Sequence, residues 1–310
     1  MNENHCTTKG LIVLDWGTTN VRLALLSFDG SVVEERRGPS GVGTFSREQF
    51  EAHFDELTNG WPQVPAIAAG MVGSRQGWRE AKYLPCPVST TDLVQGLQHF
   101  THKGRPVTIV PGLTLVDGER FDVMRGEESQ IAGYLTQNPE FTGTLLMPGT
   151  HSKWVEIDGG TVVNFHTYMT GEVFEALSDH TILRHSLSNP GGEPNHFYSK
   201  IDKLARSPGS IEGALFGLRA RHLLTGCNTN ELHQELSALL ILSELNAGQK
   251  DGFQLSDTVV LIGSESLTGL YRRALKALGK EATCIRGTGL VWPALFELAC
   301  KSKMITGTQA

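Results

Sequence analysis

The chain has 310 residues, enough for about two domains of ordinary size. Hydrophobic residues make up 39% of the sequence and charged residues 19%, which excludes an intrinsically disordered chain and favours well-packed cores. The formal net charge of -6 argues against a nucleic-acid or anionic-membrane partner. An anionic small molecule would need local arginine or lysine side chains.

The cysteines and the apolar segments indicate the compartment. The five cysteines are odd in number, scattered and never in CxxC spacing, so they predict neither a disulfide framework nor a zinc site. The N-terminus lacks the apolar region of a signal peptide, and the apolar runs are too short to span a bilayer. These features predict a cytoplasmic protein, and they leave open whether it is a homo-oligomer.

The first predicted unit has three strands and lies at residues 11–35. Its first, apolar strand ends at Asp15 and is followed by a tight turn, a second strand, a hairpin and a third strand. A turn of glycine and threonine offers backbone N–H groups and hydroxyls without a bulky side chain, which suits a phosphate chain. A carboxylate beside it can hold Mg²⁺. We predict that Asp15 is a catalytic, metal-binding residue and that the ATP phosphates contact Gly17, Thr18 and Thr19.

A second copy of this unit lies at residues 145–167. Its turn has the sequence PGTHS at 148–152, and a DGG hairpin follows. We predict that this turn binds ATP phosphates through Gly149, Thr150, His151 and Ser152. Two such units in one chain could hold one nucleotide from two sides, as in a two-domain phosphotransferase. The duplication places the domains at 1–142 and 143–310.

After the first unit a helix is predicted around 47–57, then a buried strand that begins at residue 66, and the segment at 70–78 (GMVGSRQGW) follows that strand. Arginine can hold a carboxylate through two parallel hydrogen bonds, serine and glutamine suit hydroxyls, and tryptophan can form one wall of a sugar site. The alternative is a surface loop with incidental polarity. We predict that the substrate-binding residues of this loop are Ser74, Arg75, Gln76 and Trp78.

The RGEESQ segment at 125–130 begins a predicted helix at 126–135. Phosphoryl transfer to a hydroxyl uses a carboxylate that orients the hydroxyl and accepts its proton. Glu127 is the predicted base and Glu128 the alternative, while Arg125 is a further substrate-binding candidate. Two carboxylates in a first helical turn can also be a solvated helix start.

The second half of the chain continues the α/β pattern with a mixed sheet. Helices are predicted at 172–188, 213–224 and 231–246, with a turn-rich loop at 188–195. A strand at 258–262 then leads through a GSES turn into a helix at 267–278. A glycine at such a junction lets a flat ring approach the backbone, so the predicted adenosine-binding residues are Gly263, Ser264 and Ser266.

Several motifs together resemble a known family. The DWGTTNVR segment at 15–22 and the PGTHSKW segment at 148–154 resemble the first and second phosphate motifs of the sugar kinase, Hsp70 and actin superfamily. Together with GMVGSRQGW at 70–78 and MRGEE at 124–128, they resemble the 2-dehydro-3-deoxygalactonokinases. The resemblance implies an α/β protein with two actin-like (ribonuclease H-like) domains, whose mixed sheets are flanked by helices, and an active site in the cleft between the domains.

The same resemblance implies ATP-dependent phosphorylation of the 6-hydroxyl of 2-dehydro-3-deoxy-D-galactonate, in D-galactonate catabolism. It places Gly126 and Glu127 where related carbohydrate kinases have the Gly-Asp pair that carries the base. The chain departs from the pattern in having Glu instead of Asp there, and Lys82 where a proline is expected. Two other classes stay open: a kinase of another sugar or sugar acid, and a nucleotide hydrolase of the actin-like superfamily. Arg75 and Arg125 favour an acid substrate.

Overall fold

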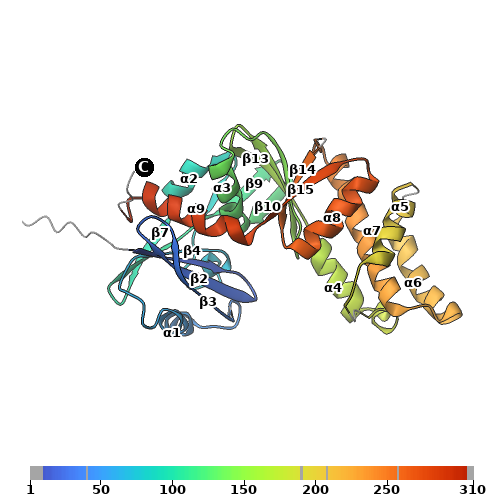
Figure 1. Ribbon diagram of the computed structural model, residues 1–310, viewed down its shortest axis with the longest axis horizontal. Helices are drawn as coiled ribbons and strands as arrows, with labels where there is room; N and C mark the ends of the chain where they lie inside the picture. The colour runs from blue at the N-terminus through green and yellow to red at the C-terminus, as the bar shows by residue number, and fades with distance from the viewer. Residues whose placement is uncertain (1–9, 40, 189–190, 207–208, 257, 306–310) are drawn as a thin grey trace, which may run out of the picture. The chain divides into compact units, whose positions relative to one another are not determined.

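The computed structural model describes residues 10–39, 41–188, 191–206, 209–256 and 258–305, which form two compact units (Figure 1). The first unit comprises Met1–Phe141, Asp158–Asn164 and Gly287–Ala310, and the second comprises Thr142–Ile157 and Phe165–Arg286. These units differ from the domains predicted at 1–142 and 143–310 mainly in the position of the last helix. The last helix belongs to the first unit, because it packs against a helix and two strands of that unit.

The first unit contains a six-stranded mixed sheet in the order β3-β2-β1-β4-β8-β7. The pairings β1–β2, β2–β3 and β7–β8 are antiparallel, whereas β1–β4 and β4–β8 are parallel. The strands are β1 (Gly10–Trp16), β2 (Asn20–Ser27), β3 (Val32–Pro39), β4 (Ala66–Ala69), β7 (Gln98–His102) and β8 (Arg105–Ile109). The three-strand hairpin unit predicted at 11–35 is thus confirmed.

The core of the first unit follows from the two-residue period of its central strand. Ile12 and Leu14 of β1 share a buried cluster with Phe50 and Phe54 of α1 (Arg47–Leu57). The predicted helix at 47–57 matches α1 residue for residue. Ser46 begins it with a capping box, in which its side chain accepts from the Gln49 backbone and the Gln49 side chain accepts from the Ser46 backbone.

The rest of the first unit carries the elements that lead to its functional residues. A separate three-stranded sheet, which the sequence did not predict, has the order β10-β9-β5. Helix α3 packs against the last helix, α9. These elements are η1 (Met71–Gly73), β5 (Tyr83–Pro85), β6 (Val88–Ser89), α2 (Thr90–Gln95), β9 (Gly112–Asp117), β10 (Arg120–Met124), α3 (Glu127–Gln137) and α9 (Thr288–Lys301).

The second unit repeats the topology of the first. Its sheet has the order β15-β14-β11-β12-β13-β6, and the first five strands occupy the same sequence of positions as β8-β4-β1-β2-β3. The pair β11–β12 is antiparallel, whereas β11–β14 and β14–β15 are parallel. The strands are β11 (Gly143–Met147), β12 (Ser152–Asp158), β13 (Thr161–Tyr168), β14 (Thr258–Gly263) and β15 (Glu281–Arg286). Each unit therefore has the strand order of an actin-like domain, and the predicted α/β class with mixed sheets is confirmed.

In the described part of the second unit, six helical segments accompany the sheet. Helices α5, α7 and α8 contribute to the apolar core at its sheet, and a second cluster joins α4, η2, α6 and α7. The predicted helix at 172–188 is too long: α4 ends at His180, because Thr181 has an extended backbone and caps η2. The segments are α4 (Thr170–His180), η2 (Ile182–His185), α5 (Asn195–Arg206), α6 (Ile211–Thr225), α7 (Thr229–Lys250) and α8 (Glu265–Ala277).

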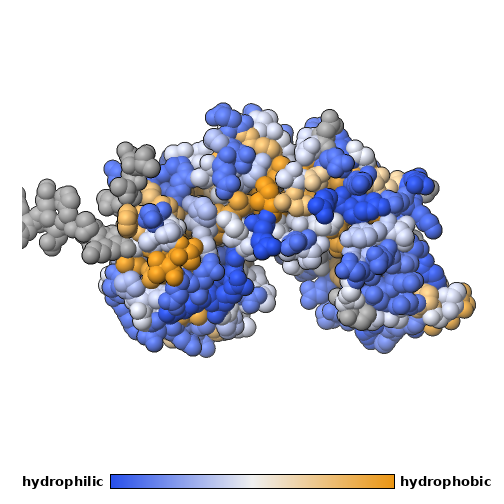
Figure 2. Space-filling model, in the orientation of Figure 1, coloured by the Kyte–Doolittle hydropathy of each residue, from blue (hydrophilic) through white to orange (hydrophobic). Residues whose placement is uncertain are grey.

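The outward faces of these helices are mainly hydrophilic in Figure 2, with apolar colour near the tip of the α6 region. The large apolar side chains that α6 exposes are Phe216, Leu223 and Leu224. Across the part of the chain that the structure describes, no helix is long and apolar enough to cross a membrane.

Helix α3 approaches α9 so closely that Gly133 has no room for a side chain. A Cβ at Gly133 would lie 2.0 Å from the backbone oxygen of Leu290. We expect Gly133→Ala to lower the free energy of unfolding by about 1–3 kcal/mol, since the helices must move apart. Gly217→Ala in α6 is the matched control, because nothing lies within 4 Å of its Cβ position. It should raise stability by about 0.5–1 kcal/mol. Urea denaturation measures both, and equal midpoints for Gly133→Ala and wild type would contradict the packing argument.

Candidate functional site

Three backbone segments that were predicted to carry chemistry meet in the first unit. Gly70 has a φ of 95°, and a Cβ on it would lie 2.7 Å from the backbone oxygen of Trp16. Gly126 has a φ of 111°, and its Cβ position is 3.5 Å from the Cα of Gly70. Only glycine combines these backbone angles with these close approaches. The turn after Asp15, the loop at 70–78 and the start of α3 are therefore neighbours.

The first predicted phosphate turn joins β1 to β2. The Gly17 N–H donates to the backbone oxygen of Asn20 over 3.0 Å, and the side chains of Thr18 and Thr19 are exposed. Asp15 is a quarter exposed, at 24%, and its Oδ2 accepts from Arg22 on the paired strand over 2.5 Å. Because that ion pair uses Oδ2, the other carboxylate oxygen of Asp15, Oδ1, can bind another cation.

The residues at this turn fit the usual mode of Mg²⁺ binding. Within the described ranges, no three His, Cys, Asp or Glu side chains gather as a metal cage. Mg²⁺ commonly keeps several waters and is held by one or two carboxylates together with substrate phosphates. A single carboxylate such as Asp15, placed beside a turn that can hold phosphates, suits that mode.

Arg125 is a buried cation whose hydrogen bonds are incomplete. It is 8% exposed, its Nη2 donates to the Ala81 backbone oxygen over 2.7 Å, and its guanidinium carbon lies 4.3 Å from the centre of the Tyr83 ring. Among the described residues, neither Nε nor Nη1 has a hydrogen-bond partner. The buried hydroxyl of Ser74 also has none there, and the Cβ position of the preceding Gly73 lies 2.8 Å from Nη1. Such donors need an acceptor, and a carboxylate matches them best.

The other predicted residues of the 70–78 loop differ in their exposure. Arg75 has a side chain that is 83% exposed and lies 3.7 Å from the carboxylate of Glu80. Gln76 is also exposed. An exposed pair of this kind contributes little energy. Arg75 is therefore a weaker candidate for a carboxylate clamp than Arg125.

Trp78 lies inside the first unit and is 1% exposed. Its ring contacts the rings of Trp16, Phe54, Phe100 and His102 at centroid distances of 5.0–6.4 Å. The prediction that Trp78 forms a wall of the substrate site is wrong, because a ring enclosed by four others presents no face to a sugar. Its position stabilises the sheet that carries Asp15.

Glu127 and Glu128 begin α3 and have different environments. Glu128 is 1% exposed, and its carboxylate accepts from the Gly126 N–H over 2.6 Å and from the Ser129 hydroxyl over 3.3 Å. Burial, with the neighbouring charge of Glu127 adding to it, raises the pKa of Glu128 to about 8. Glu127 is only partly buried. Glu128 therefore closes the helix start internally, and Glu127 is the carboxylate that a ligand can reach.

The second predicted phosphate turn joins β11 to β12 in the second unit. The start of α4 covers it: a Cβ on Gly171 would lie 2.6 Å from the Gly149 backbone oxygen, and the Glu172 N–H donates to Thr150 over 3.0 Å. His151 lies beside Glu172, and the two side chains are hydrogen-bonded. Gly149 and Thr150 remain the residues of this turn that are suited to phosphate.

Ser152 is fully buried, and this overturns its prediction as a phosphate contact. Its hydroxyl lies 3.2 Å from the hydroxyl of Tyr271 and accepts a long bond of 3.5 Å from the Gly149 N–H. The side chain points into the unit because Ser152 is the first residue of β12, where alternate side chains enter the core.

A cavity of about 770 Å³ opens beside this turn, within the second unit. It lies in the usual size range of small-molecule sites, roughly 300–1,000 Å³. Apolar and aromatic walls come from α4, α5, α7 and α8, and Gly149 and Ser266 both line it. The lining also includes Phe174, Phe197, Tyr198, Asn230, His233, Gln234 and Leu270.

The three predicted adenosine residues lie at the junction of β14 and α8, next to the second turn. The Cβ position of Gly263 is 3.3 Å from the Pro148 backbone oxygen. Ser266 lines the large cavity, whereas Gly263 lines a smaller one of about 320 Å³. The Ser264 side chain caps α8 by accepting from the Leu267 N–H over 3.4 Å. The structure thus brings the second turn and the adenosine junction together.

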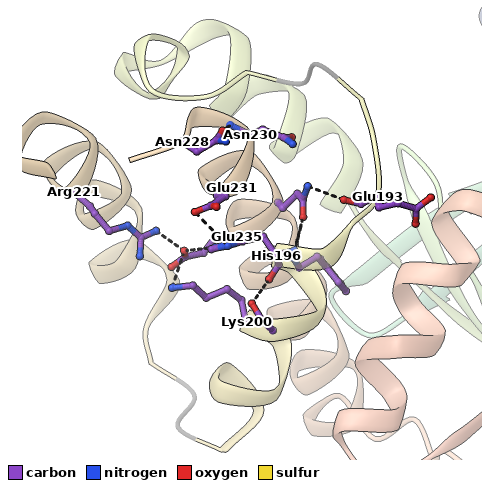
Figure 3. A network of polar contacts seen from close by, with 11 residues as sticks. Glu193, His196, Lys200, Arg221, Asn228, Asn230, Glu231 and Glu235 are labelled. Atoms are coloured by element: carbon purple, nitrogen blue, oxygen red, sulfur yellow. Dashed lines mark hydrogen bonds and ion pairs between the residues drawn. The ribbon is translucent and has the colours of Figure 1, made fainter. Parts of the chain in front are cut away.

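A polar network fixes one wall of the large cavity (Figure 3). Glu235 of α7 is 9% exposed and contacts Lys200 and His196 of α5 and Arg221 of α6. Burial alone would raise the pKa of Glu235, but the hydrogen bonds from Arg221 and Lys200 outweigh it and lower that pKa. The neighbouring Gln234, which lines the cavity, accepts from the first amides of α5. The network holds α5 in place against α7.

Comparison with known proteins identifies the family. The profile of the family described as 2-keto-3-deoxy-galactonokinase matches residues 15–298. The chain belongs to this family. A probable 2-dehydro-3-deoxygalactonokinase, DgoK1, of Rhizobium meliloti (strain 1021) is 35% identical over 286 residues, which are 90% of this chain and 93% of that protein. The 2-dehydro-3-deoxygalactonokinase of Escherichia coli (strain K12) is 33% identical over 282 residues, 90% of this chain and 94% of that protein.

A solved structure agrees with this family membership. A crystal structure of a Sinorhizobium meliloti protein assigned to the 2-dehydro-3-deoxygalactonokinases superposes on this chain with a TM-score of 0.86. The identity is 33%, and the match covers 94% of this chain and 96% of that one. The resemblance read from the sequence motifs is therefore confirmed.

Sequence reasoning missed the helical walls of the cavity. Gln234, His233 and Asn230 of α7 and Phe174 of α4 belong to no local motif, and only packing between helices far apart in the chain brings them together. One signal was available: Gly171, directly before the helix predicted at 172–188, marks a close backbone approach.

The protonated state of Glu128 predicts a pH-dependent stability. Its pKa is raised from 4.5 to about 8, so the native state binds a proton that the unfolded chain releases. The free energy of unfolding should therefore fall as the pH rises from about 4.5 to about 8. Glu128→Gln keeps the shape and an acceptor oxygen for Gly126, and should flatten this decline. Urea unfolding across that range, with Glu127→Gln as the control, measures it. Parallel pH profiles for wild type and Glu128→Gln would disprove the buried proton.

Proposed function

We propose that this protein transfers the γ-phosphoryl group of ATP to the 6-hydroxyl of 2-dehydro-3-deoxy-D-galactonate, as a step of D-galactonate catabolism. The family supplies the reaction class, and the observation that carries the proposal is Arg125, a buried guanidinium beside Gly73 with two nitrogens that have no partner among the described residues. A neutral sugar offers those donors only hydroxyl oxygens, whereas a sugar acid brings a carboxylate, whose charge-assisted hydrogen bonds are stronger.

In this proposal the second unit holds the nucleotide. The 770 Å³ cavity has apolar and aromatic walls suited to a purine and ribose, and the turn at Gly149 lies at its edge. Backbone N–H groups of the turn that follows Gly149 suit the phosphate oxygens. Mg²⁺, when bound, neutralises charge that develops on the phosphates. Asp15 is the residue that would hold it.

The first unit is proposed to hold the sugar acid. Nη1 of Arg125 would donate to its carboxylate, with the second hydrogen of Nη2 beside it, while the stacking of Arg125 on Tyr83 and its bond to Ala81 fix the guanidinium. Ser74 has a buried hydroxyl that suits the 2-oxo group or a hydroxyl of the same molecule. A clamp of this kind converts binding energy into orientation of the accepting hydroxyl.

Glu127 is proposed to orient that hydroxyl and accept its proton. It stands at the first position of α3, directly after Gly126, and is only partly buried. Glu128 is excluded from contact with the hydroxyl by its burial and by its bond to the Gly126 amide. The proposed roles of the two residues therefore differ: Glu127 would act on the substrate, whereas Glu128 fixes the backbone at Gly126.

The reaction is tested by measuring ADP release against a panel of acceptors with and without Mg²⁺. We expect release with 2-dehydro-3-deoxy-D-galactonate, much less with neutral sugars, and none after chelation of the metal. Mass analysis of the product should show one added phosphate at the terminal carbon. Equal release with and without acceptor would indicate a nucleotide hydrolase and overturn the proposal.

Arg125→Gln should raise KM for the sugar acid by roughly 10- to 100-fold and leave KM for ATP nearly unchanged, because a charge-assisted contact is worth about 1.5–3 kcal/mol. Arg75→Gln is the matched control, since this arginine is exposed and its side chain lies beside Glu80. It should change neither KM appreciably. Steady-state kinetics with one substrate varied at a time distinguishes them. If Arg75→Gln shows the larger effect, the carboxylate clamp lies in the exposed loop.

Glu127→Gln should lower kcat by about 10²–10⁴-fold with little change in either KM, because the lost proton acceptor matters mainly in the transition state. Glu128→Gln preserves the bond to Gly126 and should retain most of the activity. Single-turnover measurements separate the chemical step from product release. An active Glu127→Gln beside an inactive Glu128→Gln would assign the base to the buried neighbour.

A further inference from the structure

A buried chain of hydrogen bonds leads from the second phosphate turn into the second unit. The Gly149 N–H donates to Ser152 over 3.5 Å, the Ser152 hydroxyl lies 3.2 Å from the hydroxyl of Tyr271, and Tyr271 donates to Oε2 of Glu244. The three side chains are at most 3% exposed. Since Tyr271 donates to Glu244, its oxygen is left to accept from Ser152, whose own oxygen accepts from Gly149. All the bonds can therefore point the same way, toward the carboxyl group.

Glu244 is fixed at the inner end of this chain. The indole nitrogen of Trp154 can only donate, and it lies 2.9 Å from Oε1. Gly248, one helical turn further along α7, leaves the space for that indole, because a Cβ there would lie 2.6 Å from the ring. Burial raises the pKa of Glu244, and hydrogen bonds from Thr170, Tyr271 and Trp154 oppose that rise. The carboxyl group thus joins α7 to β12, α8 and the start of α4.

Stable packing of this core does not require the hydrogen-bonded chain from Gly149 to Glu244. The neighbouring positions of α7 carry Ile241, Leu242 and Leu245, which are apolar and buried in the same cluster. A buried carboxyl group costs more than an apolar side chain of similar volume unless its bonds are complete. Here they are complete, and they end at the turn. We propose that Tyr271, held by Glu244, is a positioning residue that fixes the Gly149–Ser152 turn for the nucleotide phosphates.

This inference rests on the proposed nucleotide site and adds an internal support to it. The outer side of the turn is held separately by α4, through the contact of Gly171 with Gly149 and the bond from Glu172 to Thr150. Loss of the inner chain should therefore loosen the turn without unfolding the unit. The expected consequence is weaker nucleotide binding with the sugar-acid site of the first unit unaffected.

The test is a double-mutant cycle on MgADP binding, measured by calorimetry without acceptor. Tyr271→Phe and Ser152→Ala each remove one hydroxyl of the chain, and each should weaken MgADP by about three- to tenfold. The double variant should bind no more weakly than the weaker single variant, because both changes break the same chain. Tyr168→Phe is the matched control, since it removes a hydroxyl that donates over 2.5 Å to Asp251 at an exposed position. It should bind MgADP normally.

Kinetics on the same variants supply the second readout. KM for ATP should rise in Tyr271→Phe and Ser152→Ala, whereas KM for the sugar acid should not. Unchanged MgADP affinity in Tyr271→Phe, or effects that multiply in the double variant, would overturn the positioning role. A wild-type protein that does not bind MgADP overturns both proposals, whereas binding without phosphorylation of a sugar acid overturns only the assigned acceptor.

Discussion

Both predicted phosphate turns depend on one packing constraint, a glycine pressed against a backbone carbonyl oxygen. In the first unit Gly70 lies against Trp16, and in the second Gly171 lies against Gly149, with Cβ positions 2.7 and 2.6 Å from the respective oxygens. Any side chain at either glycine would push the segments apart. The loop at 70–78 and helix α4 therefore reach their turns only because these two residues have no side chain.

The buried ionisable groups differ in how completely their hydrogen bonds are satisfied. Glu235 is surrounded by cations, and Glu244 accepts hydrogen bonds from neutral donors on three other elements. Arg125 is buried to a similar degree, but its Nη2 donates to the Ala81 backbone oxygen and its other two nitrogens have no partner among the described residues. Since a fold that needs only stability satisfies its buried donors, the incomplete set around Arg125 indicates a ligand. The complete sets around Glu235 and Glu244 indicate internal support.

The sequence predicted what local patterns determine. The two hairpin units, α1 and the junction of β14 with α8 follow from strand alternation, a capping box and glycine-containing turns, and the structure has each of them. The sequence could not decide the burial of Trp78 or Ser152, because a side chain beside a motif can point outward or into the core. The return of α9 to the first unit depends on its packing with α3, which no local pattern encodes.

The buried polar groups also determine which phosphate acceptors the proposed site can distinguish. A site discriminates strongly against a molecule that leaves its buried polar groups unpaired, and weakly against one that only changes shape in an apolar region. Arg125 and Ser74 present buried donors, so loss of the acid group should matter far more than a change elsewhere in the acceptor. Two epimers carry the same carboxylate, and both can satisfy the arginine. Discrimination between them must come from a buried group that contacts the epimeric hydroxyl itself, and our candidate in the 70–78 loop is the buried hydroxyl of Ser74.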